Sequence, residues 1–398
     1  MHLRSERIVT PGGVVAGEVV VQDGRIARVD LDVNVVDVDG STGPAVLDLG
    51  ARWLVPGFID LHVHGGGGYQ VNGARAEDIA GLARFHAGHG TTGLLATAVA
   101  AAPDELVATM ESIGAAAAAA GRRSGAARVL GAHLEGPFLS LGLPGAMDPE
   151  WFLDSDPALL RRLMLAGGGC LALMTVAPEL AGARGLVEEL VEAGVVVSLG
   201  HTAASYEVAA AAVRAGARSA THVFNAMVPF HHRAPGVLGA VLESERVSCE
   251  LICDGVHVSP VAARLVHRLK GCDGIHLVTD AMAGAGMPDG VYRLGERAVR
   301  VGGGRAVSAD GATLAGSTLT MDRAVANAVR MLGIPMQEAV AMASGNPARL
   351  LGLDDRRGAI APGFDADLAV LDHELRARGT MVAGEWVVKP AAASETGA

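Results

Sequence analysis

The sequence PGFIDLHVHG at residues 56–65 decides the fold, because it places two histidines at the end of a short apolar strand. The run FIDLH (58–62) has the length and apolar content of a buried strand, and the chain continues through Val63 to His64. A buried strand that ends in imidazoles is typical of a strand that delivers side chains to a site.

Seven similar apolar runs follow, separated by Ala-rich stretches with a helical pattern. They are TGLLAT (92–97), VLGAHL (129–134), LALMTV (171–176), VVVSL (195–199), SATHV (219–223), CELIC (249–253) and IHLVT (275–279). Alternating strands and helices predict βα units around a parallel sheet, and eight such units predict the α/β class in its (β/α)₈ or TIM-barrel form.

Both ends of the chain have a different pattern, with short runs of strand-forming residues separated by turns. Residues 18–29, EVVVQDGRIARV, predict a hairpin that turns at Asp23-Gly24. Near the C-terminus, the runs ADLAVLD (366–372) and MVAGEWVV (381–388) show the same strand-like pattern. We therefore expect a small β-sandwich domain built from residues 1–56 and 358–398, with the barrel occupying residues 57–357.

Composition excludes several classes of protein. Of the 398 residues, 50% are hydrophobic and 19% charged, which is typical of a compact folded chain. The net charge of -11 argues against a nucleic-acid partner. No apolar run is long enough to span a membrane, and the N-terminus lacks the features of a signal peptide. With four cysteines and no CxxC pair, we expect reduced thiols and a cytoplasmic location.

Polar residues fall at the carboxyl ends of six of the eight predicted strands, where barrel enzymes build their active sites. They are His62, His64, Glu135, His201, His222, His257 and Asp280. A barrel that needed only stability would end its strands in turn residues. The pattern therefore predicts an active site.

The residue types indicate a hydrolytic metal centre. Glu135, His201 and His222 supply one carboxylate and two imidazoles, the set that a catalytic zinc site uses beside an open position for water. We expect Asp280 to move a proton from the water to the leaving group. His257 is expected to hydrogen-bond the developing oxyanion or the substrate.

A series of ordered motifs resembles the N-acetylglucosamine-6-phosphate deacetylase family of the amidohydrolase superfamily over essentially the whole chain. The motifs are PGFIDLHVHG (56–65), HLEGPF (133–138), TVAPE (175–179), GHTAA (200–204), THVFNAM (221–227), HHRAPG (231–236), DGVH (254–257), VTDAM (278–282), LAGS (314–317), GNPARLLGL (345–353) and GFDADLAVLD (363–372). The resemblance implies a barrel with a β-sandwich and a homodimer whose neighbouring subunit helps to close the pocket. It implies a phosphorylated N-acetyl amino sugar as substrate, with Asn225, the Ala226 backbone and Arg233 as phosphate-binding elements.

The resemblance leaves open whether one or two ions bind. Family members that keep a His-x-His after the first strand can hold a second ion, so His62 and His64 keep this option. Zinc is the first expectation, with iron, manganese, cobalt and nickel as alternatives. A carboxylated lysine between two ions is excluded, because neither Lys270 nor Lys389 follows a predicted barrel strand.

One position departs from the family pattern. Met147, in PGAMDP, stands where the family has a histidine that touches the substrate, and a thioether cannot donate a hydrogen bond. We therefore keep two alternatives to the deacetylation of N-acetylglucosamine 6-phosphate. One is the same reaction on another N-acyl amino sugar, such as N-acetylgalactosamine 6-phosphate. The other is a non-catalytic sugar-phosphate sensor.

Overall fold

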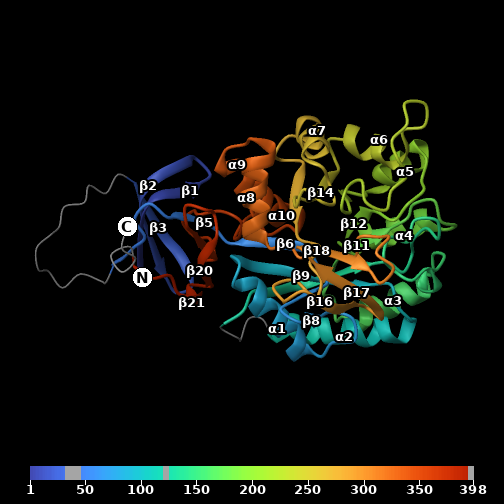
Figure 1. Ribbon diagram of the computed structural model, residues 1–398, viewed down its shortest axis with the longest axis horizontal. Coiled ribbons are helices and arrows are strands. Elements are labelled where there is room, and N and C mark those ends of the chain that lie inside the picture. The colour runs from blue at the N-terminus through green and yellow to red at the C-terminus, as the bar shows by residue number, and fades with distance from the viewer. Residues whose placement is uncertain (32–45, 120–124, 393–398) are drawn as a thin grey trace, which may run out of the picture.

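A computed structural model describes residues 1–31, 46–119 and 125–392, and a parallel barrel forms its centre (Figure 1). The barrel strands pair in chain order. They are β6 (Phe58–Val63), β9 (Thr91–Val99), β10 (Arg128–Glu135), β11 (Leu171–Val176), β12 (Val196–Leu199), β13 (Ser219–Ala220), β14 (Ser248–Ile252) and β15 (Ile275–Val278). These bounds confirm the eight predicted strands. Strand β13 is shorter than expected, because the chain turns directly after Ala220.

The seam between β6 and β15 is held largely by one buried side chain. Asp60 accepts hydrogen bonds from the Thr279 amide (3.2 Å) and the Thr279 hydroxyl (2.6 Å). Burial raises the pKa of Asp60 to about 7. One residue further on, the Asp280 amide donates to the His62 carbonyl (2.9 Å). The closure of the barrel therefore places Asp280 beside the first strand.

Helices pack around the outside of the barrel (Figure 1). They are α1 (Ala76–Ala87), α2 (Pro103–Ala119), α3 (Pro157–Ala166), α4 (Ala183–Glu192), α5 (Tyr206–Ala215), α6 (Gly236–Glu243), α7 (Pro260–Lys270), α8 (Met321–Leu332), α9 (Met336–Ala343) and α10 (Gly345–Leu350), with a 3₁₀ turn η1 (Pro149–Trp151). Several begin at a residue that favours helix starts. Ser259, for example, caps α7 by accepting a hydrogen bond from the Ala262 amide, and Pro260 occupies the first helical position.

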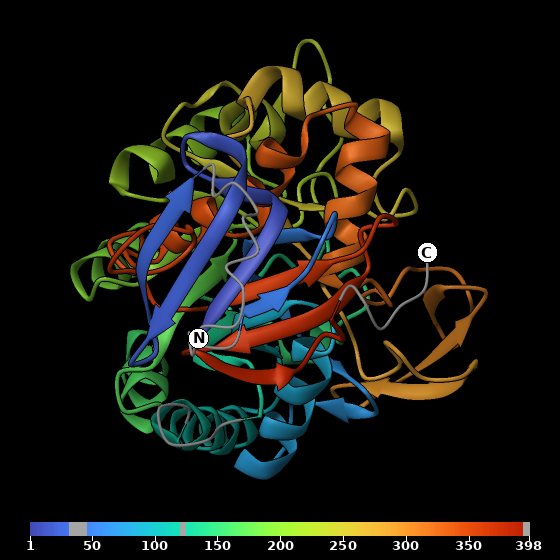
Figure 2. The ribbon, with the colours of Figure 1, turned by 90° about the vertical axis from the view of Figure 1, so that its left-hand side faces the viewer.

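The two chain ends form one mixed sheet beside the barrel, with the N-terminal and C-terminal strands facing the viewer in Figure 2. Its strands are β1 (His2–Thr10), β2 (Gly13–Gln22), β3 (Arg25–Leu31), β4 (Val46–Asp48), β5 (Trp53–Pro56), β19 (Leu368–Leu371), β20 (Ala377–Val382) and β21 (Glu385–Val388). The two halves join where β5 pairs with β19. The predicted hairpin is confirmed, and both turn residues, Asp23 and Gly24, have positive φ as a tight hairpin turn requires.

A small sheet before α8 was not predicted from the sequence. It contains β16 (Gly290–Leu294), β17 (Arg297–Gly302) and β18 (Arg305–Ser308), and a short pair β7 (Gly65–Gly66) and β8 (Tyr69–Gln70) lies after the first barrel strand. The apolar signal of β17 is weak, because only Val299 and Val301 are buried in it.

The division of the chain into domains at residues 56 and 358 stays a prediction, and residues 32–45 and 393–398 of the accessory part lie outside the described residues. Within the described residues no helix is both long and apolar enough to cross a membrane.

Candidate active site

Several predicted site residues leave their strands with an unusual backbone. His201 follows β12, His222 follows β13 and Asp280 follows β15, with φ angles of 47°, 29° and 50°. Positive φ is uncommon for residues other than glycine, and such strained positions gather at functional sites. The strain turns these side chains toward the carboxyl end of the barrel.

Three of these side chains meet in a compact group, which we call the Glu135 triad (Glu135, His201 and His222). The Glu135 Oε1 atom lies 3.0 Å from His201 Nε2 and 2.8 Å from His222 Nε2. The two Nε2 atoms are 3.1 Å apart, and all three residues are buried. The structure thus brings together the three residues predicted as metal ligands.

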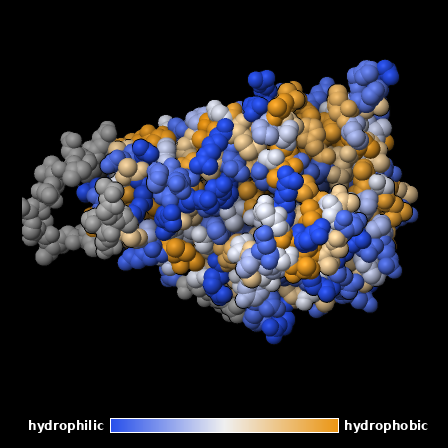
Figure 3. Space-filling model, in the orientation of Figure 1, coloured by the Kyte–Doolittle hydropathy of each residue, from blue (hydrophilic) through white to orange (hydrophobic). Residues whose placement is uncertain are grey.

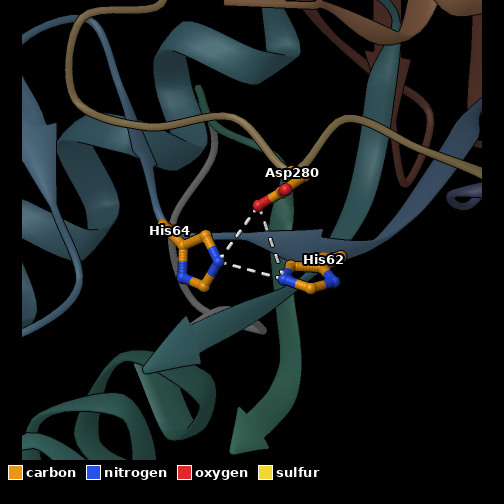
Figure 4. Close-up of side chains that lie close together, drawn as sticks. All are labelled: His62, His64 and Asp280. Carbon is orange, nitrogen blue, oxygen red and sulfur yellow. Dashed lines mark hydrogen bonds and ion pairs between the residues drawn. The ribbon is translucent and has the colours of Figure 1, made fainter. Parts of the chain in front are cut away.

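A second group, the His-x-His triad, consists of His62, His64 and Asp280 and is drawn in Figure 4. The Nε2 atoms of His62 and His64 are 3.0 Å apart, and His64 Nε2 lies 3.1 Å from Asp280 Oδ1. The distance from His62 Nε2 to the same oxygen is 3.5 Å. The proton-transfer candidate therefore sits against the two histidines that follow strand β6.

The Glu135 carboxylate joins the two triads. Its Oε1 atom faces His201 and His222, whereas its Oε2 atom lies 3.2 Å from His64 Nε2 and 3.7 Å from His62 Nε2. Glu135 thus offers one oxygen to each group and could take part in holding an ion at either.

The outer nitrogens of the imidazoles show which way their lone pairs point. His201 Nδ1 lies 2.9 Å from the Leu143 carbonyl, and His64 Nδ1 lies 3.1 Å from the Thr97 carbonyl. A carbonyl only accepts, so both Nδ1 atoms donate a proton, and in the neutral rings each Nε2 keeps its lone pair. Lone pairs on facing nitrogens repel unless a proton or a cation lies between them. Both triads are therefore candidate sites for a divalent cation.

The charges of the cluster agree with this assignment. Burial by itself raises the pKa of Glu135, but the surrounding imidazoles of His62, His201 and His222 hold it well below its usual value. Burial lowers the pKa of His64, but hydrogen bonds to Asp280 and Glu135 outweigh burial and raise that pKa to about 9. Ionised carboxylates that draw protons onto neighbouring imidazoles would equally attract a metal cation.

A cavity of about 290 Å³ opens onto both triads. Its lining includes most of the other residues predicted for the site, namely His257, Met147, Asn225 and Ala226. Asn225 donates from its side-chain amide to the His222 carbonyl (3.1 Å), which fixes it beside the Glu135 triad. Ala226 has a φ of 48°, so the backbone here is also strained.

His257 is held by a carboxylate three residues earlier. Its Nδ1 atom lies 2.6 Å from Asp254 Oδ2, while Asp254 Oδ1 accepts from the His257 amide (2.9 Å). Burial opposes the charged imidazole, but Asp254 and then Asp280 raise the pKa of His257 above its usual value. His257 is thus oriented and kept protonated over a wider pH range.

Met147 forms part of an apolar wall. It is buried, and it packs in one hydrophobic cluster with Val99 and Leu294, which also line the cavity. Leu294 ends strand β16, so the small sheet that was not predicted from the sequence supplies part of the cavity wall.

Arg233 is a predicted site residue that lies apart from the cavity, whereas His62, which also does not line it, contacts His64 of the lining. The Arg233 side chain is exposed, and its guanidinium lies 2.7 Å from His232 Nε2. The segment that carries it projects from the barrel near α5 and α6 (Figure 1). Within one chain, Arg233 and the triads are not brought together.

Three polar residues beside the triads were not singled out from the sequence. Glu250 bonds His62, Asp254 bonds His257, and the His133 ring packs edge to face on His62 with centroids 4.6 Å apart. Glu250 and His133 lie inside apolar strand runs, and a charged residue in such a run is the signal that could have revealed Glu250.

The chain is similar to known proteins over most of its length. The amidohydrolase family model matches residues 53–387. N-acetylglucosamine-6-phosphate deacetylase of Lysinibacillus sphaericus is 36% identical over 92% of each chain. N-acetylgalactosamine-6-phosphate deacetylase of Escherichia coli O157:H7 is 37% identical over 96% of this chain and 98% of that protein. The solved structure of a Mycobacterium smegmatis N-acetyl-D-glucosamine-6-phosphate deacetylase variant, in complex with N-acetyl-D-glucosamine 6-phosphate, has a TM-score of 0.91 at 39% identity and covers 98% of this chain and 99% of that chain.

Proposed function

The chain belongs to the amidohydrolase family, and on that premise we propose that it hydrolyses N-acetylglucosamine 6-phosphate to glucosamine 6-phosphate and acetate. One observation carries the proposal above all. The Glu135 triad and the His-x-His triad, both candidate metal sites, contact each other through Glu135 and face a single cavity that His257 also lines. Such a site can hold an amide carbonyl between an electrophile and a proton carrier.

Glu135, His201 and His222 would hold one ion, and His62 and His64 would hold a second that shares Glu135. Imidazole nitrogens and carboxylate oxygens suit zinc best, although iron, manganese, cobalt and nickel accept the same ligands. When bound, a divalent ion lowers the pKa of a water molecule and polarises the acetyl carbonyl. Two separate groups of potential ligands favour two ions over one.

Asp280 would carry the proton. Its ionised carboxylate can accept a proton from the attacking water and return it to the amine that leaves. Burial raises its pKa, yet His62 and His64 hold the pKa below its usual value, so the group begins the reaction as a base. His257 has its Nδ1 atom bound to Asp254, and its other ring nitrogen would donate to the acyl oxygen as negative charge develops there.

The sugar phosphate would be held by residues from two chains. Asn225 and the Ala226 backbone line the cavity, whereas Arg233 lies outside it. An arginine is well suited to a phosphate. We therefore assign Arg233 to the cavity of a second subunit in a homodimer.

Exposed apolar side chains on two segments fit such an assembly. Val261, Leu265 and Leu269 form an apolar stripe along α7 and are 61%, 50% and 63% exposed. Figure 3 shows hydrophobic surface gathered over this helix at the upper edge of the molecule. Phe230, at 58% exposed, lies on the same segment as Arg233. An exposed apolar stripe of this kind is typical of a protein interface.

Met147 favours one second candidate, the same hydrolysis of N-acetylgalactosamine 6-phosphate. This residue gives the cavity a thioether wall that cannot donate a hydrogen bond to a sugar hydroxyl, so the wall can discriminate poorly between sugars that differ at one hydroxyl. We place the enzyme in the cytoplasm, in keeping with four free cysteines.

The test measures acetate release by zinc-loaded protein from three compounds: N-acetylglucosamine 6-phosphate, N-acetylgalactosamine 6-phosphate and unphosphorylated N-acetylglucosamine. We expect turnover of the first compound and little of the third. A higher kcat/KM for the galactosamine compound would establish the second candidate instead. Absence of acetate from every compound, by folded and fully metallated protein, would reject both.

A further inference from the structure

Glu250 is a buried carboxylate for which the proposed reaction has no use. It lies in the middle of β14 with 0% exposure, between the apolar residues Cys249 and Leu251. Its Oε2 atom lies 3.0 Å from His62 Nδ1 and accepts from the His222 amide at 3.1 Å. Its Oε1 atom has no hydrogen-bond partner among the described residues. A carboxylate held in this way is costly in a barrel core, so its function has to account for the cost.

The two contacts connect Glu250 to both triads. His62 belongs to the His-x-His triad, and the His222 amide belongs to the backbone that carries a ligand of the Glu135 triad. The His222 amide can only donate, so Glu250 Oε2 acts as an acceptor toward it. The same oxygen acts as an acceptor toward His62, and His62 Nδ1 must then carry the proton.

The protonated Nδ1 decides which nitrogen of His62 can bind a metal. With its proton on Nδ1, the neutral ring has its lone pair on Nε2, and Nε2 is the atom that faces His64 at 3.0 Å and Asp280 at 3.5 Å. A carboxylate behind a histidine ligand also makes the ring a stronger donor and fixes its plane. In the other histidine of this triad, His64, the Nδ1 atom contacts only a neutral carbonyl.

We propose that Glu250 is a positioning residue that sets His62 as an Nε2 ligand and thereby determines whether the second ion binds. The inference rests on the proposed metal-dependent function, but it concerns ion content rather than turnover. Glu250 acts through His62 and does not touch the cavity, whose lining does not include it.

A third metal site behind His62 is the competing reading, because His62, His133 and Glu250 also cluster within bonding range of one ion. The contacts of His133 argue against it. Its Nε2 atom lies 2.8 Å from the Thr175 hydroxyl and its Nδ1 atom 3.3 Å from the Thr97 hydroxyl, so both ring nitrogens already have partners. The His133 ring thus packs edge to face against His62, with both of its nitrogens engaged by threonine hydroxyls.

The experiment compares Glu250→Leu, which removes the acceptor, with Glu250→Gln, which keeps an acceptor oxygen but loses the charge. Asp322→Asn is the matched control, because Asp322 is equally buried and faces an imidazole, His89, that belongs to neither triad. Purified proteins are stripped, titrated with zinc and analysed for ions per chain by mass spectrometry. The thermal unfolding midpoint of each metal-free protein is measured in parallel.

We expect two ions for the wild type and for Asp322→Asn, and one for Glu250→Leu. For Glu250→Gln we expect two ions, with the affinity for the second weakened by about 10- to 100-fold. If Glu250→Leu does not fold, the affinities of Glu250→Gln decide. Unchanged affinities in the Glu250 variants, or a single ion already in the wild type, would overturn the proposal. So would equal weakening of both ions together with a lower midpoint, since that indicates a merely structural role.

Failure of this inference and failure of the proposed function give different results. A wild-type protein that binds two ions but releases no acetate from any tested sugar would refute the function and leave the role of Glu250 intact. A protein that deacetylates its substrate with identical ion content in all variants would refute only the role of Glu250.

Discussion

Two buried polar clusters lie in different parts of the molecule, and they differ in how their charges are matched. The cluster formed by the two triads lies at the carboxyl end of the barrel. The second, which we call the arginine cluster, contains Arg128, Arg357, Asp365 and Asp367. In it Arg357 lies 3.1 Å from Asp365 and 3.2 Å from Asp367, and Arg128 lies 3.0 Å from Asp365. Every short contact there joins a donor to an acceptor.

The triads do not match in this way. Nε2 atoms face each other at 3.0 Å between His62 and His64 and at 3.1 Å between His201 and His222. Because Glu135 and Asp280 are held in their ionised form, these facing nitrogens call for protons or a metal cation between them. In the arginine cluster the positive charge comes from arginine side chains of the chain itself, whereas the triads would take theirs from bound protons or a metal cation. This difference separates a structural cluster from a functional one.

The largest effect should follow removal of metal. Dialysis against a chelator should abolish acetate release, and a divalent ion should restore it, because only the triads need a cation. An ion present at 100 times its Kd also adds about 2.7 kcal/mol to the free energy of unfolding, so the unfolding midpoint should fall on stripping. Full activity in protein shown to be metal-free would remove the distinction between the clusters.

Asp280→Asn should come next. The amide keeps the shape of the side chain but can no longer take up a proton, and loss of a general acid–base group lowers kcat by about 10²- to 10⁴-fold. The measurement is kcat for N-acetylglucosamine 6-phosphate, with ligand affinity followed by calorimetry. A sensor would bind the sugar phosphate and function equally well with either residue, so an unchanged kcat and unchanged binding would favour that alternative.

Sequence reasoning predicted the residues of the site that lie at the ends of barrel strands. All eight barrel strands and the residues of both triads were located in advance, because a carboxyl-terminal strand end is a position that can be read from the order of residues. Asn225, Ala226, His257 and Met147 also reach the cavity, as expected.

The rest of the site could not be predicted from the sequence, because it depends on contacts between residues that are far apart in the chain. Glu250 and His62 are 188 residues apart and meet only because β14 and β6 lie in one barrel. The small sheet of β16, β17 and β18 was missed because its strands are short and half polar, and its contribution to the cavity wall through Leu294 was missed with it. The position of Arg233 could not be read from its motif, since a motif does not state which chain's cavity it serves.

Arg357→Met should affect stability and leave catalysis intact. Arg357 is buried, and its loss leaves Asp365 and Asp367 with one arginine between them. Breaking a buried ion pair costs about 3–5 kcal/mol, measured as the free energy of unfolding in urea. Ion content and kcat of the folded variant should match the wild type.

The control is Arg161→Met, which breaks an exposed pair with Glu189 and should cost less than about 1 kcal/mol. A drop in kcat for the folded Arg357→Met protein would mean that the arginine cluster also serves the reaction, and the two regions would no longer be separable.

Met147→Gln should change selectivity without changing ion content. The glutamine restores a hydrogen-bonding side chain to the apolar cavity wall, and a site that bonds a hydroxyl rejects the epimer more strongly. We expect the ratio of kcat/KM between N-acetylglucosamine 6-phosphate and N-acetylgalactosamine 6-phosphate to change by about 10-fold. Met147→Leu should keep the wild-type ratio. Equal ratios in all three proteins would show that the wall does not contact the part of the sugar that differs.

The smallest effect concerns the pH dependence of His257, an imidazole that lines the cavity and contacts Asp254. Asp254 and Asp280 raise the pKa of His257 against the opposing effect of burial. A raised folded pKa means that this group stabilises the fold fully below the unfolded value of about 6.5, and that the stabilisation is lost as pH rises through the folded pKa. Asp254→Asn keeps the hydrogen-bond acceptor but removes the charge, so the pKa of His257 should move down.

The alkaline limb of kcat should therefore shift to lower pH in Asp254→Asn, with kcat near neutrality reduced by at most about 10-fold. The free energy of unfolding of the wild type should fall more steeply between neutral and alkaline pH than that of the variant. If both proteins have the same alkaline limb, His257 does not act as a protonated donor. The proton that the substrate oxygen needs would then come from elsewhere in the cavity, and His257 would resemble the arginine cluster, in which charge serves only to hold the fold together.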